Sequence, residues 1–172
     1  RIVSTDEWYL NIKLDSDTYF NHSAEIGRRK YANNSYDHFD TPIFPEIDKG
    51  ISLAMDINGS GSFNYKRDIR DIDEMNGIWS LRLGKNEDNK EIFLSGDLRG
   101  LIPDGLQIAI VDIAERNVSY SLLEEGIIIN KNPNISYDLK LVAGDLDYVN
   151  RTAEEILSNI PSEFSLGQNY PN

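Results

Sequence analysis

Apolar and polar residues alternate with a period of two along most of the chain. In residues 8–14 every second residue is large and apolar, and residues 77–83 repeat the pattern. A period of two is typical of strands, because successive side chains of a strand point to opposite faces. Further segments of strand character lie at residues 51–57, 63–69, 92–98, 106–113, 126–130 and 135–144.

The connections between these segments are short and rich in Gly, Asn, Asp and Pro. Asn58-Gly59 is a reversal signal, because both residues accept positive φ, so residues 51–57 and 63–69 are expected to form a hairpin. No helical periodicity of useful length occurs before residue 148. Short strands without intervening helices predict an all-β fold over residues 1–148, an antiparallel β-sandwich of immunoglobulin-like or jelly-roll-like type.

Residues 15–50 depart from this pattern. They are polar, alternate weakly and carry Pro42 and Pro45. We expect one short strand near residues 24–27, and otherwise a long loop folded over one end of the sandwich.

The pattern changes again after the last predicted strand. Thr152 and Glu155 have the spacing of a capping box, and Pro161 ends the apolar run that follows. Residues 149–161 are therefore expected to form a short helical linker, and residues 162–172 an extended tail.

Composition narrows the classes of partner. The 172 residues hold 17 Lys and Arg against 29 Asp and Glu, a net charge of −12. This balance argues against nucleic acid and anionic lipid, both of which need clustered basic residues. No apolar run approaches the roughly 20 residues of a membrane span. The absence of cysteine excludes disulfides and thiolate metal sites.

The stretch YDHFDTPIFPEID is the best candidate for a metal site. It gathers carboxylates in a proline-stiffened loop, and calcium accepts irregular sites made only of oxygen. The alternative is that the first two aspartates cap turns by accepting backbone N–H bonds. The candidate calcium ligands are Asp37, Asp40, Glu46 and Asp48.

Other candidate sites are less favoured than structural interpretations. Asp56, Asn58 and Ser60 have the spacing that opens a calcium loop, but a hairpin turn explains them better. The two histidines, His22 and His38, are too few for a typical zinc site, and they do not by themselves indicate a hydrolase triad. The paired carboxylates of DIRDIDE, at residues 68–74, are interpreted as a solvated face rather than a glycosidase pair. We therefore expect no catalytic residues and no enzyme activity.

Two features are compatible with an extracellular surface. Tyr9, Tyr31, Tyr36 and Phe39 are candidates for a carbohydrate platform, with core packing as the alternative. The Asn-x-Ser/Thr pattern occurs six times, either as glycosylation sites or as a consequence of many Asn-rich turns. The six asparagines are Asn21, Asn33, Asn58, Asn117, Asn134 and Asn150.

The last residues, FSLGQNYPN, resemble the start of the C-terminal sorting domain of the type IX secretion system. In that domain a Pro and a Phe-x-Leu precede Gln-Asn-Tyr-Pro-Asn-Pro-Phe-Asn-Pro, and Pro161 takes the place of the first Pro. The resemblance implies a cargo protein that the secretion machinery exports to the outside or the surface of a Gram-negative bacterium. The residues that match the sorting signal are Phe164, Leu166, Gln168, Asn169, Tyr170, Pro171 and Asn172.

Together these features predict a non-catalytic secreted or cell-surface protein with a structural role, as a subunit of a surface layer or an extracellular filament. Residues 1–7 and 162–172 are the expected strand donors to neighbouring copies. The alternative is an accessory module of a larger secreted enzyme that binds carbohydrate or protein.

Overall fold

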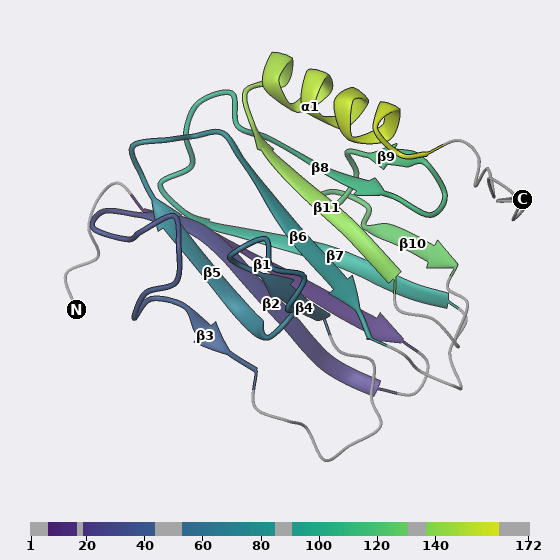
Figure 1. The fold of residues 1–172 in the computed structure, drawn as a ribbon, viewed down its shortest axis with the longest axis horizontal. Coiled ribbons are helices and arrows are strands. Elements are labelled where there is room, and N and C mark those ends of the chain that lie inside the picture. Colours follow the sequence, from purple (N-terminus) through teal and green to yellow (C-terminus); the bar gives the residue numbers. More distant parts are fainter. Residues whose placement is uncertain (1–6, 17–18, 44–52, 85–90, 131–136, 162–172) are drawn as a thin grey trace, which may run out of the picture.

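The computed structural model describes residues 7–16, 19–43, 53–84, 91–130 and 137–161. Eleven strands of one sheet and one helix lie in this part of the chain (Figure 1). The strands are β1 (Trp8–Ser16), β2 (Tyr19–Arg29), β3 (Thr41–Pro42), β4 (Leu53–Asp56), β5 (Tyr65–Asp71), β6 (Gly77–Leu83), β7 (Glu91–Gly100), β8 (Gln107–Asp112), β9 (Asn117–Ser119), β10 (Ile127–Asn130) and β11 (Tyr137–Gly144), and the helix is α1 (Leu146–Ser158).

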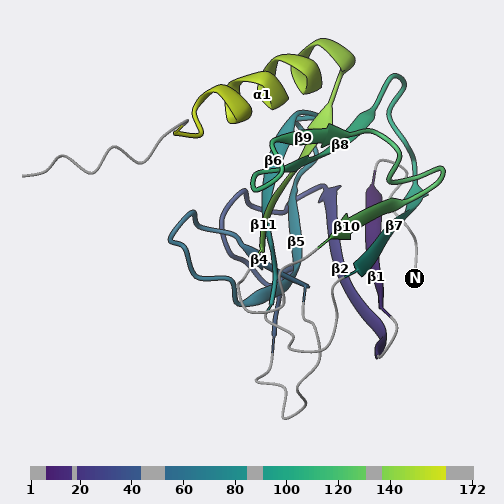
Figure 2. The ribbon, with the colours of Figure 1, turned by 90° about the vertical axis from the view of Figure 1, so that its right-hand side faces the viewer.

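The strand order is β10-β7-β1-β2-β5-β4-β6-β11-β8-β9, with β3 beside β5. All pairs are antiparallel except β2 with β5, which run parallel. The sheet curls over on itself, so that β1, β2 and β7 form one layer and β4, β6 and β11 the other (Figure 2). The fold is therefore mostly β, nearly closed and sandwich-like, as the alternation predicts.

The core fills the space between these two layers. Every second residue from Trp8 to Leu14 and from Trp79 to Leu83 is fully buried. Strands β7 and β11 contribute their inward residues to the same cluster. Complete burial of one large apolar side chain stabilises a fold by roughly 1.5–3 kcal/mol, so the alternation supplies most of the driving force.

Strand β2 corrects the expectation of a long loop with a short strand at residues 24–27. It is 11 residues long and lies between β1 and β5, and Ile26 is opposite Leu10. The apolar pattern misses it because the buried position after Ile26 is Arg28, a charged residue. Gly27 also belongs to the packing, since a Cβ there would lie 2.5 Å from the carbonyl oxygen of Trp8.

The reversal predicted after residue 57 is present. Gly59 and Gly61 both adopt positive φ, of 65° and 79°. The carboxylate of Asp56 accepts hydrogen bonds from the backbone N–H groups of Ser60 (3.2 Å) and Gly61 (2.6 Å). Asp56 thus closes the turn that leads into β5, in agreement with the hairpin interpretation.

Helix α1 packs on the outer face of β8 and β11 (Figures 1 and 2). Asp145 is its N-cap and accepts a 2.8 Å hydrogen bond from the backbone N–H of Tyr148. The capping box expected at Thr152 is wrong, because Thr152 lies buried in the middle of the helix. Val149 and Ala153 pack on the sheet, which fixes the helix to the sandwich. The helix is too short and too polar to span a membrane.

Candidate functional site

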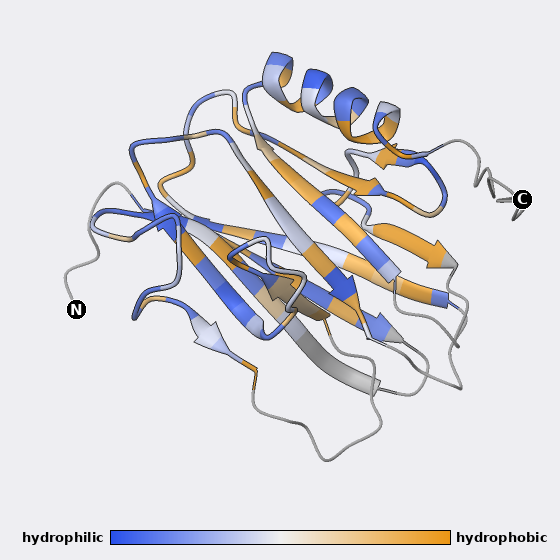
Figure 3. Ribbon diagram, in the orientation of Figure 1, coloured by the Kyte–Doolittle hydropathy of each residue, from blue (hydrophilic) through white to orange (hydrophobic). Residues whose placement is uncertain are grey.

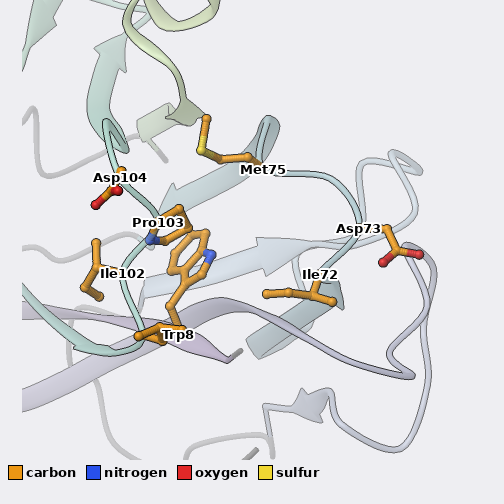
Figure 4. A pocket seen from close by; sticks show the side chains of 8 residues that line it. Trp8, Ile72, Asp73, Met75, Ile102, Pro103 and Asp104 are labelled. Atoms are coloured by element: carbon orange, nitrogen blue, oxygen red, sulfur yellow. The ribbon is translucent and has the colours of Figure 1, made fainter. Parts of the chain in front are cut away.

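A pocket of about 500 Å³ opens at one end of the sandwich, between the loop that joins β5 to β6 and the loop that joins β7 to β8 (Figure 4). The first loop contributes Ile72, Asp73 and Met75, and the second contributes residues 101–104. The lining is mainly apolar, with one carboxylate on each loop. The lining residues are Trp8, Ile72, Asp73, Met75, Leu101, Ile102, Pro103 and Asp104.

The loop after β7 is anchored to the start of β1. Gly100 has a φ of 96°, and a Cβ at this position would lie 2.1 Å from the carbonyl oxygen of Glu7. The same carbonyl accepts a 2.8 Å hydrogen bond from the backbone N–H of Leu101. Only glycine allows this close approach. The anchor leaves the side chain of Leu101 60% exposed at the pocket.

The loop after β5 is held by the buried guanidinium of Arg28. This group donates hydrogen bonds to the backbone carbonyls of Asp71 (2.9 Å) and Asn76 (2.5 Å), the two residues that flank the pocket-lining segment. It also lies 5.4 Å from the ring centroid of Trp79. Burial lowers the pKa of Arg28, and the neighbouring Arg70 lowers it further. One buried cation therefore fixes both ends of the loop.

The amide of Asn76 connects this loop to α1. Its side-chain oxygen accepts a 3.2 Å hydrogen bond from the backbone N–H of Asp145, the N-cap residue of the helix. A Cβ at Gly144 would lie 2.3 Å from the same oxygen, so a side chain there would displace the Asn76 amide from this contact. The pocket wall and the helix are consequently parts of one packed unit.

Trp8 lies between the two loops. Its side chain is fully buried, and its indole Nε1 has no hydrogen-bond partner. In Figure 4 this nitrogen faces the side of the pocket on which Ile72 and Met75 lie. Trp79 also has an unpartnered indole nitrogen, but it does not line the pocket. The pocket thus combines an apolar lining with an unused donor.

An ion pair with a buried carboxylate lies in β5. Asp68 is 1% exposed and pairs with Arg70 at 2.9 Å. Burial raises the pKa of Asp68, and the charge of Arg70 opposes that effect. The interpretation of residues 68–74 as a solvated face is therefore wrong for Asp68, because its strand position points inward.

The two candidate calcium ligands that the structure describes, Asp37 and Asp40, cap a turn. The Asp37 carboxylate accepts hydrogen bonds of 2.7 Å from the backbone N–H groups of Asn33 and Phe39. The Asp40 carboxylate accepts bonds from the N–H groups of Asp37 (2.8 Å) and Ile69 (2.9 Å).

Burial raises the pKa of Asp40 to about 6, although its two backbone hydrogen bonds act in the opposite direction. Glu46 and Asp48 lie outside the described residues, so the predicted calcium site stays a prediction. No group of three or more His, Cys, Asp and Glu side chains gathers in the described part of the chain.

The aromatic candidates lie apart from the pocket. Tyr31 is exposed, Tyr36 packs against Tyr65, Arg29 covers Phe39, and the guanidinium of Arg67 lies over the ring of Tyr9. His38 is exposed, and His22 lies in β2.

The remaining sequence candidates lie on several elements. Asn33, Asn58, Asn117 and Asn150 are exposed, the last on α1 rather than in a turn. Asn21 lies in β2, and Asn134 lies outside the described residues, as do all the sorting-signal residues from Phe164 to Asn172.

A second feature is the edge of the sheet at β10. Within the described residues β10 pairs only with β7. Ile128 on β10 is 59% exposed, and its partner in the register, Phe93 on β7, is 37% exposed. Figure 3 shows β10 as an apolar strand at this edge. The sequence run GIIIN predicts the strand but not its place at the end of the strand order.

Comparison of the chain with protein-family models, with curated proteins and with solved structures finds no match.

Proposed function

We propose that this chain is a non-catalytic β-sandwich module of a secreted or cell-surface protein, with a structural role in a surface assembly. The observation that carries the proposal is the edge strand β10, which ends the strand order and exposes Ile128 beside Phe93. A sheet edge offers N–H and C=O groups to another strand, and apolar side chains on it add buried area to such a contact.

The export part of the proposal is supported by the resemblance of residues 164–172 to a type IX sorting signal. The secretion machinery is the partner of this tail. The proposal includes calcium bound at the loop that contains Asp37 and Asp40. It also includes glycans on the exposed asparagines, because both are compatible with an extracellular protein. We also infer that the sheet is a variant of the immunoglobulin-like or jelly-roll-like sandwich.

The strand that docks on β10 comes from another copy of the chain. The segments 1–7 and 162–172 are the donors that the sequence indicates, because neither has an obvious partner in the predicted sandwich. Glu7 itself is buried and pairs with Arg29 of its own chain, so the N-terminal donor is the part that precedes it. Pairing at one edge with a segment from a neighbour generates a head-to-tail contact, which builds an open filament when successive copies do not close into a ring.

A second candidate function is an accessory binding module of a larger secreted enzyme. The pocket over Trp8 favours this candidate, because it is apolar, loop-lined and holds an unused donor.

Light scattering on the purified chain tests the assembly role. We expect the molar mass to rise with concentration, and Ile128→Lys to abolish the rise by placing a charge on the edge. Leu146→Lys is the matched control, because Leu146 is 53% exposed at the start of α1, on another surface. A chain that stays monomeric at all concentrations, or an assembly that Ile128→Lys leaves intact, contradicts the proposal.

A further inference from the structure

We infer that the pocket over Trp8 binds a peptide segment that presents one apolar side chain beside a lysine or arginine. The inference is independent of the assembly role. The pocket adjoins the Gly100 end of β7, whereas β10 pairs with the opposite end, at Glu91–Leu94. Failure of one proposal therefore leaves the other standing.

The apolar part of the inference rests on the lining. Leu101 and Ile102 are 60% and 38% exposed although they belong to an ordered turn, in which Leu106 donates a 3.2 Å backbone hydrogen bond to Pro103. A volume of about 500 Å³ lies within the range of roughly 300–1,000 Å³ that small-molecule sites occupy, so one apolar side chain of a peptide has room in it. An apolar side chain of a ligand covers these residues and removes them from water.

The indole N–H of Trp8 is the reason to expect a hydrogen-bond acceptor on the ligand. A buried N–H without an acceptor is unfavourable, and the indole Nε1 of Trp8 is such a donor. It faces the side of the pocket formed by Ile72 and Met75 (Figure 4). Met75 lines this side of the pocket and has an unbranched, adaptable side chain, so a shift of Met75 is the change that access to the buried nitrogen requires. A backbone carbonyl of an entering peptide then accepts the indole hydrogen bond.

The charge part rests on Asp73 and Asp104, one on each loop that lines the pocket. Both are exposed, and neither forms an ion pair with another described residue. In Figure 4 the two carboxylates lie on opposite sides of Trp8. The net charge of −12 adds a long-range attraction for cations. A basic residue on either side of the apolar side chain therefore meets a carboxylate.

A carbohydrate fits this pocket less well. Sugars stack on the open face of an aromatic ring, but Trp8 is fully buried and the other lining residues are not aromatic. The exposed tyrosines of residues 31–36 do not belong to the pocket. The lining thus favours an aliphatic side chain over a sugar ring.

The test uses nuclear magnetic resonance of the two indole N–H groups, since the chain has only two tryptophans. Trp79→Phe assigns the two signals. The probes are the capped tripeptides acetyl-Lys-Leu-Lys-amide, acetyl-Glu-Leu-Glu-amide and acetyl-Lys-Gly-Lys-amide. We expect only the first to shift the Trp8 signal to saturation, with the Trp79 signal unchanged.

Charge-neutral variants then distinguish the effect of the Asp73 and Asp104 carboxylates from the long-range attraction of the net negative charge. Asp73→Asn with Asp104→Asn is expected to weaken binding of the Lys-Leu-Lys peptide by about three- to tenfold, as expected for two exposed ion pairs. Asp15→Asn with Glu91→Gln removes the same charge from exposed positions at the far ends of β1 and β7, and is expected to change binding by less than about twofold.

Four outcomes overturn the inference. The first is a Trp8 signal that no tripeptide shifts. The second is equal binding of the Glu-Leu-Glu peptide, and the third is equal binding of the Lys-Gly-Lys peptide. The fourth is equal weakening by both pairs of charge-neutral substitutions.

Discussion

The buried carboxylate of Asp40 accepts a 2.9 Å hydrogen bond from the backbone N–H of Ile69, 29 residues further along the chain. Its other oxygen accepts a bond from the N–H of Asp37. One side chain thus ties the loop after β2 to the middle of β5. The contact places a titratable group inside the fold, and this has a measurable consequence.

The stability of the protein should depend on pH through Asp40. Burial raises its folded pKa from 3.8 to about 6. The stabilisation is therefore complete below about pH 4 and is lost as pH rises through about 6, which amounts to up to about 3 kcal/mol. Denaturant titrations at several pH values check this. The difference in unfolding free energy between the parent chain and Asp40→Asn is expected to shrink over that interval.

Asp15→Asn serves as the control, because Asp15 is exposed on β1. Its pH profile should follow that of the parent chain. A pH profile of Asp40→Asn that is parallel to the parent profile between pH 4 and 7 would show that Asp40 does not titrate in this interval.

Arg28 should be essential for the loop that lines the pocket. Arg28→Met keeps most of the side-chain volume but leaves the part-buried carbonyls of Asp71 and Asn76 without their donor. We expect a loss of about 2–4 kcal/mol in the free energy of unfolding, because each unsatisfied buried group costs roughly 1–3 kcal/mol. Chemical denaturation measures it. Lys30→Met, at an exposed neighbouring position, should cost less than about 0.5 kcal/mol.

Much of the fold could be predicted from the sequence, because β1 and β6 alternate cleanly and bury every second side chain. Strand β2 was predicted only over residues 24–27 of its Tyr19–Arg29 range, since Arg28 occupies a buried position where the pattern requires an apolar residue. The role of Arg28 depends on its contacts with Trp79 and with the carbonyls of Asp71 and Asn76. These residues lie more than 40 positions away in the chain, so no local sequence pattern reveals the contacts. The start of α1 was missed because Asp145, rather than Thr152, caps it.

The candidate site could be predicted only in part. Asp37 and Asp40 were identified as turn-forming or metal-binding residues, and the structure shows that they accept backbone hydrogen bonds. The pocket was not predicted, because Trp8 has the period of a core residue and Leu101-Ile102 is a short apolar pair in a turn. Its residues come from three separate segments, and only the strand order brings those segments together.

Gly100 should be intolerant of a side chain. In Gly100→Ala the new Cβ meets the carbonyl oxygen of Glu7, a backbone atom that a rotamer change cannot move. Gly105→Ala is the matched control, because Gly105 also has positive φ, at 76°, but no atom lies within 4 Å of a Cβ there. Both variants incur the strain of positive φ. Gly100→Ala is expected to be less stable than Gly105→Ala by about 2 kcal/mol or more, and equal melting curves would contradict this.

Calcium should stabilise the folded chain if the loop that begins at Asp37 holds it. A ligand that binds only the folded state raises the melting temperature with its concentration. We expect millimolar calcium to raise the melting temperature, chelator to reverse the rise, and Asp37→Asn to remove it. A melting temperature that is the same with calcium and with chelator would contradict the calcium proposal.

Hydrogen exchange at β10 tests directly whether this sheet edge pairs with a strand from another copy of the chain. The measurement is the exchange rate of the backbone amides of Ile127–Asn130 at low and at high protein concentration. If the edge is used for assembly, these amides exchange more slowly at high concentration, and Ile128→Lys abolishes the change. The amides of the other strands serve as the control, and their protection should be the same at both concentrations. If the β10 amides also exchange at the same rate at both concentrations, pairing at this edge is contradicted.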